Sequence, residues 1–190
     1  TAASTKEMSE IPSEGGEGEH TPTAASTKEM SEIPSEGGEG VVARGQCLCG
    51  AVGVTARAPT NQLGVCHCSM CRTWTGGPMM CMEGPREQLT IDHGEDNITV
   101  FSSSDWGERG FCRTCGTHLF CRVKEGKGGD HCYIPVGLLC KDRPEGWEIT
   151  MQIFIDEKPS FYSLANETPT LTGEQFLAFV SQGVSQASDE

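Results

Sequence analysis

Apolar and polar residues alternate along several short stretches after residue 40, and this alternation predicts β-strands. Residues 41–59, VVARGQCLCGAVGVTARAP, alternate around tight glycine turns and predict a β-hairpin. Further strands are predicted at residues 87–92, 97–103, 118–123, 133–139 and 148–156. Turn-forming residues separate these short stretches, which is typical of a mainly β domain.

One helix is predicted near the C-terminal end, in TGEQFLAFVSQG at residues 172–183. Thr172 and Gln175 have the spacing of a capping box, which satisfies backbone N–H groups at a helix start. The apolar residues that follow share one helical face: Phe176, Leu177 and Val180. Gly183 is expected to end this short helix.

The first 40 residues have a different composition. The segment TAASTKEMSEIPSEGGEG occupies residues 1–18 and recurs without change at 23–40. It is rich in Glu, Gly, Ser and Thr and lacks apolar periodicity, so it cannot bury enough surface to offset the entropy of ordering. We therefore expect an acidic low-complexity extension over residues 1–40 and one folded domain over 41–190.

Charge limits the partners that this chain can bind. The 190 residues carry a formal net charge of −13 at pH 7, and no stripe of Lys and Arg is evident. Because polyanion binding needs cationic contacts, neither nucleic acid nor a membrane surface is an expected partner. No apolar run reaches the roughly 18–20 residues that span a bilayer, and no secretory signal is evident. These observations favour a cytoplasmic location.

Eleven cysteines are present, and seven of them form three compact groups. The groups are C-x-C at Cys47 and Cys49, C-x-C-x-x-C at Cys66, Cys68 and Cys71, and C-x-x-C at Cys112 and Cys115. In a reducing compartment such clusters are more often metal ligands or redox groups than disulfides. The isolated cysteines are interpreted as small buried apolar residues: Cys81, Cys121, Cys132 and Cys140.

Seven thiolates divide into four and three rather than into two sets of four. The triplet lies within one loop and can surround one ion, while the two pairs together form a closed four-thiolate site. Zn²⁺ is the metal best suited to several thiolates in a non-redox role. A complete tetrahedron is typical of a structural zinc, whereas three ligands leave a position that a substrate can occupy.

Three longer motifs contain these cysteines: GQCLCG, CHCSMCRTWTGGP and RGFCRTCGTHLF. Together with VGLL and FIDEKPSFY, they resemble the glutathione-dependent formaldehyde-activating enzyme family, which also includes centromere protein V-like members. The resemblance runs from about Gly45 to Thr170. The chain differs from the family pattern at Cys140, where the family commonly has an acidic residue, and at Phe161, where the family often has tryptophan. These differences leave the identity of the substrate open.

This resemblance implies a zinc-stapled, mainly β fold that methionine-R-sulfoxide reductases share. It implies two zinc ions per chain, a structural one on Cys47, Cys49, Cys112 and Cys115 and a catalytic one on Cys66, Cys68 and Cys71. The implied activity is that of a carbon–sulfur lyase of the S-(hydroxymethyl)glutathione synthase type. Its partners would be glutathione, or another small thiol, and formaldehyde or another small aldehyde.

The residues around the triplet admit more than one role. A fourth ligand from His67, Cys81 or Cys132 would turn the triplet into a second structural site. The His67 side chain is expected to point away from the metal, into a pocket or into solvent.

Three further side chains near the cysteine motifs also have two interpretations each. Arg72 and Arg109 either hold substrate carboxylates or lie on the surface. Trp74 either lines a pocket or packs in the core. His118 is expected to be structural.

Two alternative functions belong to other classes. One is a zinc-stapled binding module without catalytic turnover. The other is a thiol reductase on the same fold, which would need a reactive cysteine beside a pocket, and Cys132 and Cys140 are the candidates. An open three-thiolate metal centre favours the lyase over both.

Overall fold

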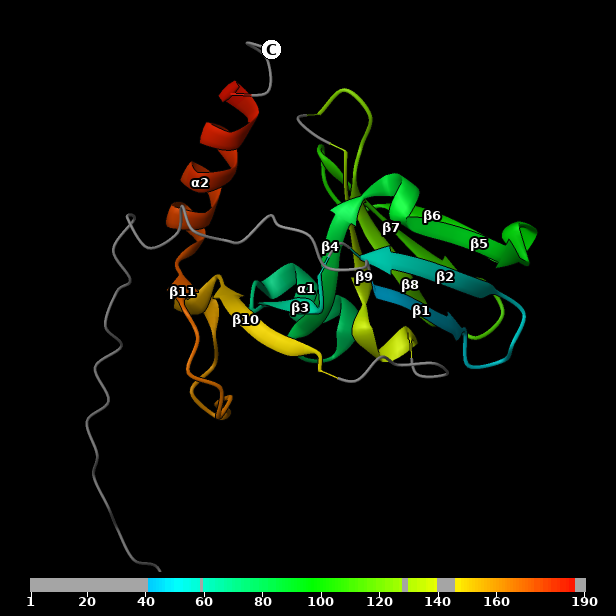
Figure 1. Ribbon diagram of the computed structural model, residues 1–190, viewed down its shortest axis with the longest axis horizontal. Helices are drawn as coiled ribbons and strands as arrows, with labels where there is room; N and C mark the ends of the chain where they lie inside the picture. Colours follow the sequence, from blue (N-terminus) through cyan, green and yellow to red (C-terminus); the bar gives the residue numbers. More distant parts are fainter. Residues whose placement is uncertain (1–40, 59, 128–129, 140–145, 187–190) are drawn as a thin grey trace, which may run out of the picture.

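The computed structural model describes residues 41–58, 60–127, 130–139 and 146–186, and in the last segment it describes side chains only up to residue 180. The predicted N-terminal extension and Cys140 lie outside these residues. Among the described residues, the strands form a three-stranded sheet of order β1-β2-β5 and an eight-stranded sheet of order β11-β10-β3-β4-β9-β8-β7-β6 (Figure 1). The protein is therefore mainly β, as the alternation predicts.

The small sheet contains β1 (Val41–Gln46), β2 (Gly53–Ala58) and β5 (Leu89–His93). The large sheet contains β3 (Gln62–Cys66), β4 (Met79–Pro85), β6 (Ile98–Ser102), β7 (Gly107–Cys112), β8 (His118–Val123), β9 (His131–Pro135), β10 (Glu148–Ile153) and β11 (Thr170–Leu171). Two α-helices accompany them, α1 (Ser69–Thr75) and α2 (Gly173–Gln186).

The main core lies between the two sheets. Val54 and Ala56 of β2 are fully buried and belong to one cluster with Leu119 of β8 and Ile134 of β9. Such burial of apolar surface is the main source of stability in a domain of this size. A second, smaller cluster contains Cys66 and Cys71 together with Met79, Cys81 and Cys121. One of the cysteine groups is thus part of the packed interior.

Several predicted strands are confirmed. The hairpin at 41–59 forms as β1 and β2, which pair antiparallel, and β8 covers the predicted residues 118–123. Two predicted strands end early: β9 gives way to a 3₁₀ turn after Pro135, and β10 ends at Ile153, before Phe154 takes a left-handed φ of 56°. Strands β3, β4, β7 and β11 and helix α1 were not predicted.

The predicted C-terminal helix forms as α2. Its capping box is present, since Thr172 N–H donates to Gln175 Oε1 at 2.9 Å and Gln175 N–H donates to Thr172 Oγ1 at 3.2 Å. The expected end at Gly183 is wrong, because the helix continues to Gln186. Phe176 packs on Phe154, so the start of α2 is fixed to the end of the large sheet while the rest extends away from it (Figure 1).

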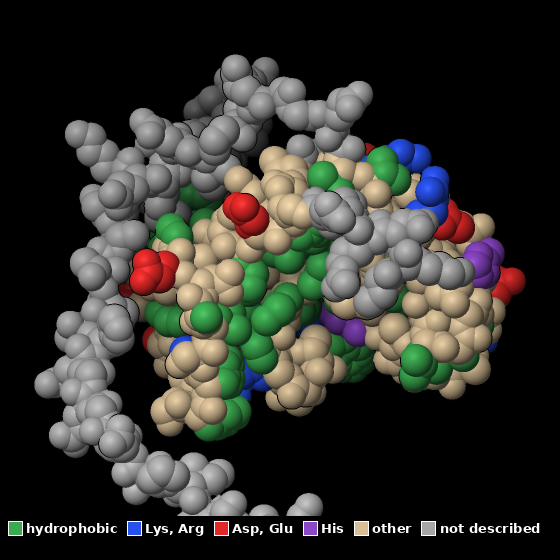
Figure 2. All heavy atoms as spheres, turned by 60° about the horizontal axis from the view of Figure 1, so that its bottom comes forward, with side chains coloured by type: hydrophobic (Ala, Val, Ile, Leu, Met, Phe, Trp, Pro, Cys, Tyr) green, Lys and Arg blue, Asp and Glu red, His purple; other side chains and the backbone are tan. Residues whose placement is uncertain are grey.

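One face of the molecule shows a band of apolar side chains, with basic side chains few and scattered (Figure 2). This face therefore offers no basic stripe of the kind that polyanions require.

Two strand glycines give a test of the packing near β7. A Cβ at Gly110 would lie 2.3 Å from Cζ of the buried Phe120, whereas a Cβ at Gly64 would meet nothing within 4 Å. Gly110→Ala should therefore lower the free energy of unfolding by about 1–3 kcal/mol, the usual cost of overpacking. Gly64→Ala should leave it unchanged or slightly higher. Thermal unfolding of both variants checks this, and equal stability would contradict the packing described.

Candidate functional site

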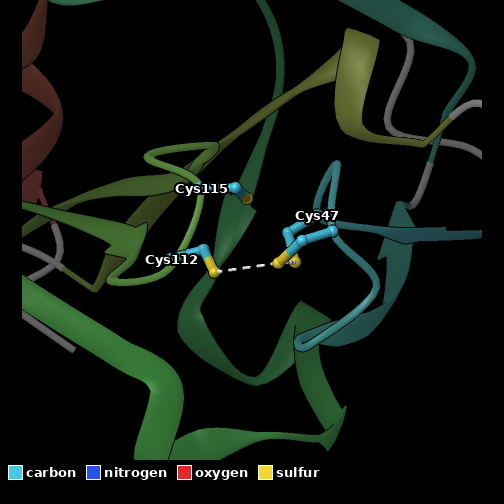
Figure 3. Close-up of side chains that lie close together, drawn as sticks. Cys47, Cys112 and Cys115 are labelled. Carbon is cyan, nitrogen blue, oxygen red and sulfur yellow. Dashed lines mark hydrogen bonds between the residues drawn. The ribbon is translucent and has the colours of Figure 1, made fainter.

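Four cysteine sulfurs converge from two turns that are far apart in sequence. Cys47 and Cys49 lie in the turn after β1, Cys112 ends β7, and Cys115 lies in the turn between β7 and β8. All four Sγ atoms lie within 4.8 Å of one another. Figure 3 shows Cys47, Cys112 and Cys115 gathered at this point. The Cys47–Cys49 and Cys49–Cys112 sulfur pairs are 3.5 and 3.8 Å apart.

These separations can be compared with a metal centre. Tetrahedral zinc with Zn–S bonds of 2.3 Å places its sulfurs about 3.8 Å apart. The four sulfurs thus have the number, chemistry and spacing of a closed thiolate site. This group could hold a metal ion.

Both turns have the same local design. Gly50 and Gly116 each take a left-handed φ, +76° and +75°, just after a cysteine, and each closes its turn by donating a backbone hydrogen bond. Val52 N–H donates to Cys47 Sγ at 3.2 Å. Hydrogen bonds from the side chain and backbone of Thr117 lower the pKa of Cys115 to about 5. These bonds therefore favour the thiolate form of Cys115 before any metal binds.

The three remaining clustered cysteines meet at the start of helix α1. Cys66 ends β3, Cys68 is the N-cap of α1 and Cys71 lies in its first turn. Their Sγ atoms also lie within 4.8 Å of one another, so this group could hold a metal ion as well. The structure thus brings together the same four and three cysteines that the sequence spacing groups. Cys66 and Cys71 are 8% and 5% exposed, while Cys68 is only half-buried and gives the most open side of the group.

Helix α1 is short, and the sequence contains few signals that predict it. Its N-cap acceptor is a sulfur, since Cys71 N–H donates to Cys68 Sγ at 3.4 Å, and cysteine is not among the usual N-cap residues. Its C-cap is Gly76, with a φ of +77°. That glycine, followed by Gly77 and Pro78, is the one signal that could have predicted the end of a helix here.

Crowding of the three sulfurs concentrates negative charge on one of them. Hydrogen bonds from Cys66 and Cys68 lower the pKa of Cys71, and Arg109 lowers it further. The same hydrogen bonds and burial raise the pKa of Cys66. Only one thiolate is therefore favoured without a cation, and a bound cation is what would let all three sulfurs be thiolates.

His67 is not a fourth ligand. Its side chain is fully buried, with Nδ1 2.7 Å from Tyr162 Oη and Nε2 3.0 Å from Gln152 Oε1. Because the amide oxygen can only accept, Nε2 carries the hydrogen and Tyr162 O–H donates to Nδ1. The alternative that His67 faces solvent is wrong, since the hydrophilic ring is enclosed by partners from β10 and the segment after it.

The other proposed fourth ligands do not join the triplet either. Within the residues that the structure describes, the group at α1 that could hold a metal ion contains three cysteines and neither Cys81 nor Cys132. The interpretation of Cys81, Cys121 and Cys132 as buried residues is confirmed. Burial raises the pKa of Cys132 to about 12, which is the opposite of what a reactive thiol in a reductase needs.

Helix α1 separates two cavities. One, of about 360 Å³, is lined by Arg72, Thr73, Gly76, Gly77, Pro78, Phe161 and Tyr162. The other, of about 410 Å³, is lined by Ser69, Met70, Thr73, Trp74, Phe101, Ser103 and Arg109. Trp74 is half-buried: it lines this second cavity, and its ring also packs on Phe111 and His118.

Three more predicted residues can now be placed. Arg72 is half-buried, and its Nε donates to the His67 carbonyl at 2.8 Å. Arg109 is not on the surface, because it is 2% exposed and donates from Nη2 to Cys71 Sγ at 3.5 Å. Burial lowers the pKa of His118 to about 4, so this ring is neutral where it meets the edge of Trp74.

Comparison with known proteins decides the family. The model of the glutathione-dependent formaldehyde-activating enzyme family matches residues 42–157, which include all seven clustered cysteines. The chain belongs to this family. None of the helices described here is long and apolar enough to cross a membrane.

Two curated relatives are similar to this chain. An uncharacterized lyase of Schizosaccharomyces pombe is 32% identical over 133 residues, covering 70% of this chain and 93% of its own. A Podospora anserina protein, provisionally named a glutathione-dependent formaldehyde-activating enzyme, is 27% identical over 110 residues, covering 54% of this chain and 49% of its own. A crystal structure of a Rhodobacter sphaeroides protein has 23% identity and a TM-score of 0.45, covering 53% of this chain and 91% of that one.

The hydrogen bond between Tyr162 and His67 can be tested directly. Tyr162→Phe would leave Nδ1 of the buried His67 without its donor, which should lower the free energy of unfolding by about 1 kcal/mol. Phe161→Leu is the matched control, because Phe161 is 85% exposed and should tolerate the change. Thermal unfolding measures the stability of both variants. A Tyr162→Phe protein as stable as the control would show that this hydrogen bond does not stabilise the fold.

Proposed function

We propose that this protein is a zinc-dependent carbon–sulfur lyase that forms or cleaves S-(hydroxymethyl)glutathione, or a related adduct of a small thiol and a small aldehyde. Membership of the family and the lyase name of the yeast relative support this reaction class. The observation that carries the proposal is the group of three cysteines at α1, which lacks a fourth His, Cys, Asp or Glu ligand among the described residues. That arrangement differs from the closed four-cysteine group.

The residues present fit two zinc ions per chain. Cys47, Cys49, Cys112 and Cys115 would hold a structural ion, since four thiolates complete a tetrahedron. Cys66, Cys68 and Cys71 would hold the catalytic one. A zinc ion bound there would stabilise the thiolate form of a substrate thiol, because a nearby cation favours the deprotonated sulfur.

The reaction itself is a balanced addition. The substrate sulfur forms a bond to the aldehyde carbon, the carbon–oxygen double bond becomes single, and the proton lost by the thiol ends on the oxygen. The reverse reaction breaks the carbon–sulfur bond and returns thiol and aldehyde. Because this addition is already easy in water, the protein has to contribute mainly by binding both reactants in a reactive geometry.

The cavity beside Arg72 is suited to the rest of a thiol such as glutathione, which carries two carboxylates. The Nε atom of Arg72 donates to the His67 carbonyl, and no bond to the terminal nitrogens of Arg72 is found among the described residues. Those nitrogens are therefore available for bidentate binding of a carboxylate. Tyr162 lines the same cavity, and its donor hydrogen is already used by His67.

The proposal predicts different effects of losing one ligand from each group. Cys68→Ser should remain folded, hold one zinc per chain fewer and lose activity, because the four-cysteine group still closes the fold. Cys112→Ser should unfold or aggregate, since structural zinc contributes directly to folding. Activity is measured by NMR exchange between glutathione with formaldehyde and their adduct, with metal content measured in parallel.

Cys132→Ala is the control for removing a buried cysteine that belongs to neither group. It should keep both metal ions and the activity, at a small cost in stability. A Cys68→Ser protein that catalyses the exchange at the normal rate would contradict the proposed catalytic role of the triplet.

A further inference from the structure

A charged arginine lies inside the molecule next to the triplet. Arg109, on β7, is 2% exposed, and its guanidinium lies over the Trp74 ring at 5.7 Å from the ring centre. Nη2 donates to Cys71 Sγ at 3.5 Å, and Nη1 lies 4.0 Å from Met79 Sδ. Nε is buried and has no hydrogen-bond partner among the described residues. Arginine stays charged in proteins, so this position contains a buried cation with incomplete hydrogen bonding.

A buried cation needs an anion close by, because removing a charge from water is costly unless it is paired. The ion pairs found among the described residues use Arg86, Arg122 and His131, and none uses Arg109. The sulfur of Cys71 is the group at bonding distance from the Arg109 guanidinium, among the described residues, that can become anionic. Arg109 is therefore placed to balance negative charge on the sulfurs of the triplet.

The two cysteine groups differ in how their charge is balanced. In the four-cysteine group Cys47 and Cys112 are buried, Cys115 is half-buried and Cys49 is exposed, and Val52 N–H donates to the Cys47 sulfur. In the triplet two of the three cysteines are buried. Three thiolates around a divalent cation carry a net charge of −1, and a fourth thiolate raises this to −2. A fixed positive charge in contact with one buried sulfur offsets this charge where the surroundings screen it less than bulk water does.

Strand β7 fixes the position of this charge. Arg109 pairs with Cys121 of β8 in the strand register, and the same strand ends three residues later at Cys112, a member of the four-cysteine group. The four-cysteine group thus sets the position of β7, and β7 sets the guanidinium against Cys71.

We propose that Arg109 is a positioning residue that supplies the fixed counter-charge of the three-cysteine centre, so that this centre can hold a metal ion and accept an anionic fourth ligand. This inference rests on the proposed function, because it requires a metal ion at the triplet. It assigns Arg109 a role other than binding a substrate carboxylate.

Cobalt(II) loaded into the full chain tests the role without an activity assay, because tetrahedral cobalt thiolate centres absorb strongly in the visible. Arg109→Met removes the charge and keeps an unbranched side chain. Arg109→Lys keeps a positive charge but replaces the planar guanidinium with an ammonium group. Arg122→Met is the matched control: Arg122 lies on the neighbouring strand β8 and is bonded to Glu108 at 2.6 Å. Competition with a chelator then gives the affinity of each cobalt.

Arg109→Met should weaken the more weakly held cobalt about 10- to 100-fold, the loss expected for one charge-assisted hydrogen bond. The tighter cobalt should be unaffected. Arg109→Lys should recover part of the affinity, and Arg122→Met should bind both ions like the parent chain. Normal affinity for both ions in Arg109→Met would overturn the inference.

A second readout separates charge from general loosening of the site. A small thiol binds cobalt as an anion and imidazole binds as a neutral ligand, and both change the visible spectrum. Arg109→Met should weaken the thiol by about tenfold or more while imidazole binds as before. Equal weakening of both ligands would mean that Arg109 acts only on the shape of the site and would overturn the inference.

The parent chain separates failure of this inference from failure of the proposed function. If the parent chain takes up one cobalt rather than two, the triplet is not a metal centre, and the proposed function and this inference fail together. If the parent takes up two and Arg109→Met behaves like Arg122→Met, only the inference fails.

Discussion

The convergence of four sulfurs between two distant turns is the contact on which the rest of this structure depends. The small sheet and the large sheet share no strand pairing among the described residues, so they are joined by the core between them and by this group. Cys47 and Cys49 come from the small sheet, and Cys112 and Cys115 come from the large one. A metal at this point would connect the sheets and set the position of β7.

Two groups with the same chemistry are placed in different surroundings, and this difference is the basis for giving them different roles. The four-cysteine group is complete and partly open to solvent, whereas the triplet is incomplete and lies against a buried arginine. We propose that the number of thiolates determines whether a further ligand can bind, and that the fixed charge of Arg109 allows this ligand to be an anion. On this proposal structure and reactivity are divided between the two groups, and strand β7 connects them.

The parts of this account that sequence could predict are those set by local spacing. The division of seven cysteines into four and three, the hairpin at 41–59 and the capping box of Thr172 and Gln175 all depend on residues close in the chain or on ligand arithmetic. Burial of His67 and Arg109 could not be predicted, since their partners come from β10, the segment after it and α1. Helix α1 was missed because a cysteine sulfur caps it.

The most direct test of the division between the two groups is zinc content against increasing chelator, with circular dichroism followed on the same samples. The account predicts that about one zinc per chain leaves first while the β spectrum is unchanged, because the triplet has three protein ligands and the four-cysteine group remains closed. The second zinc should leave only as the fold is lost. Simultaneous loss of both ions with collapse of the spectrum would contradict the account.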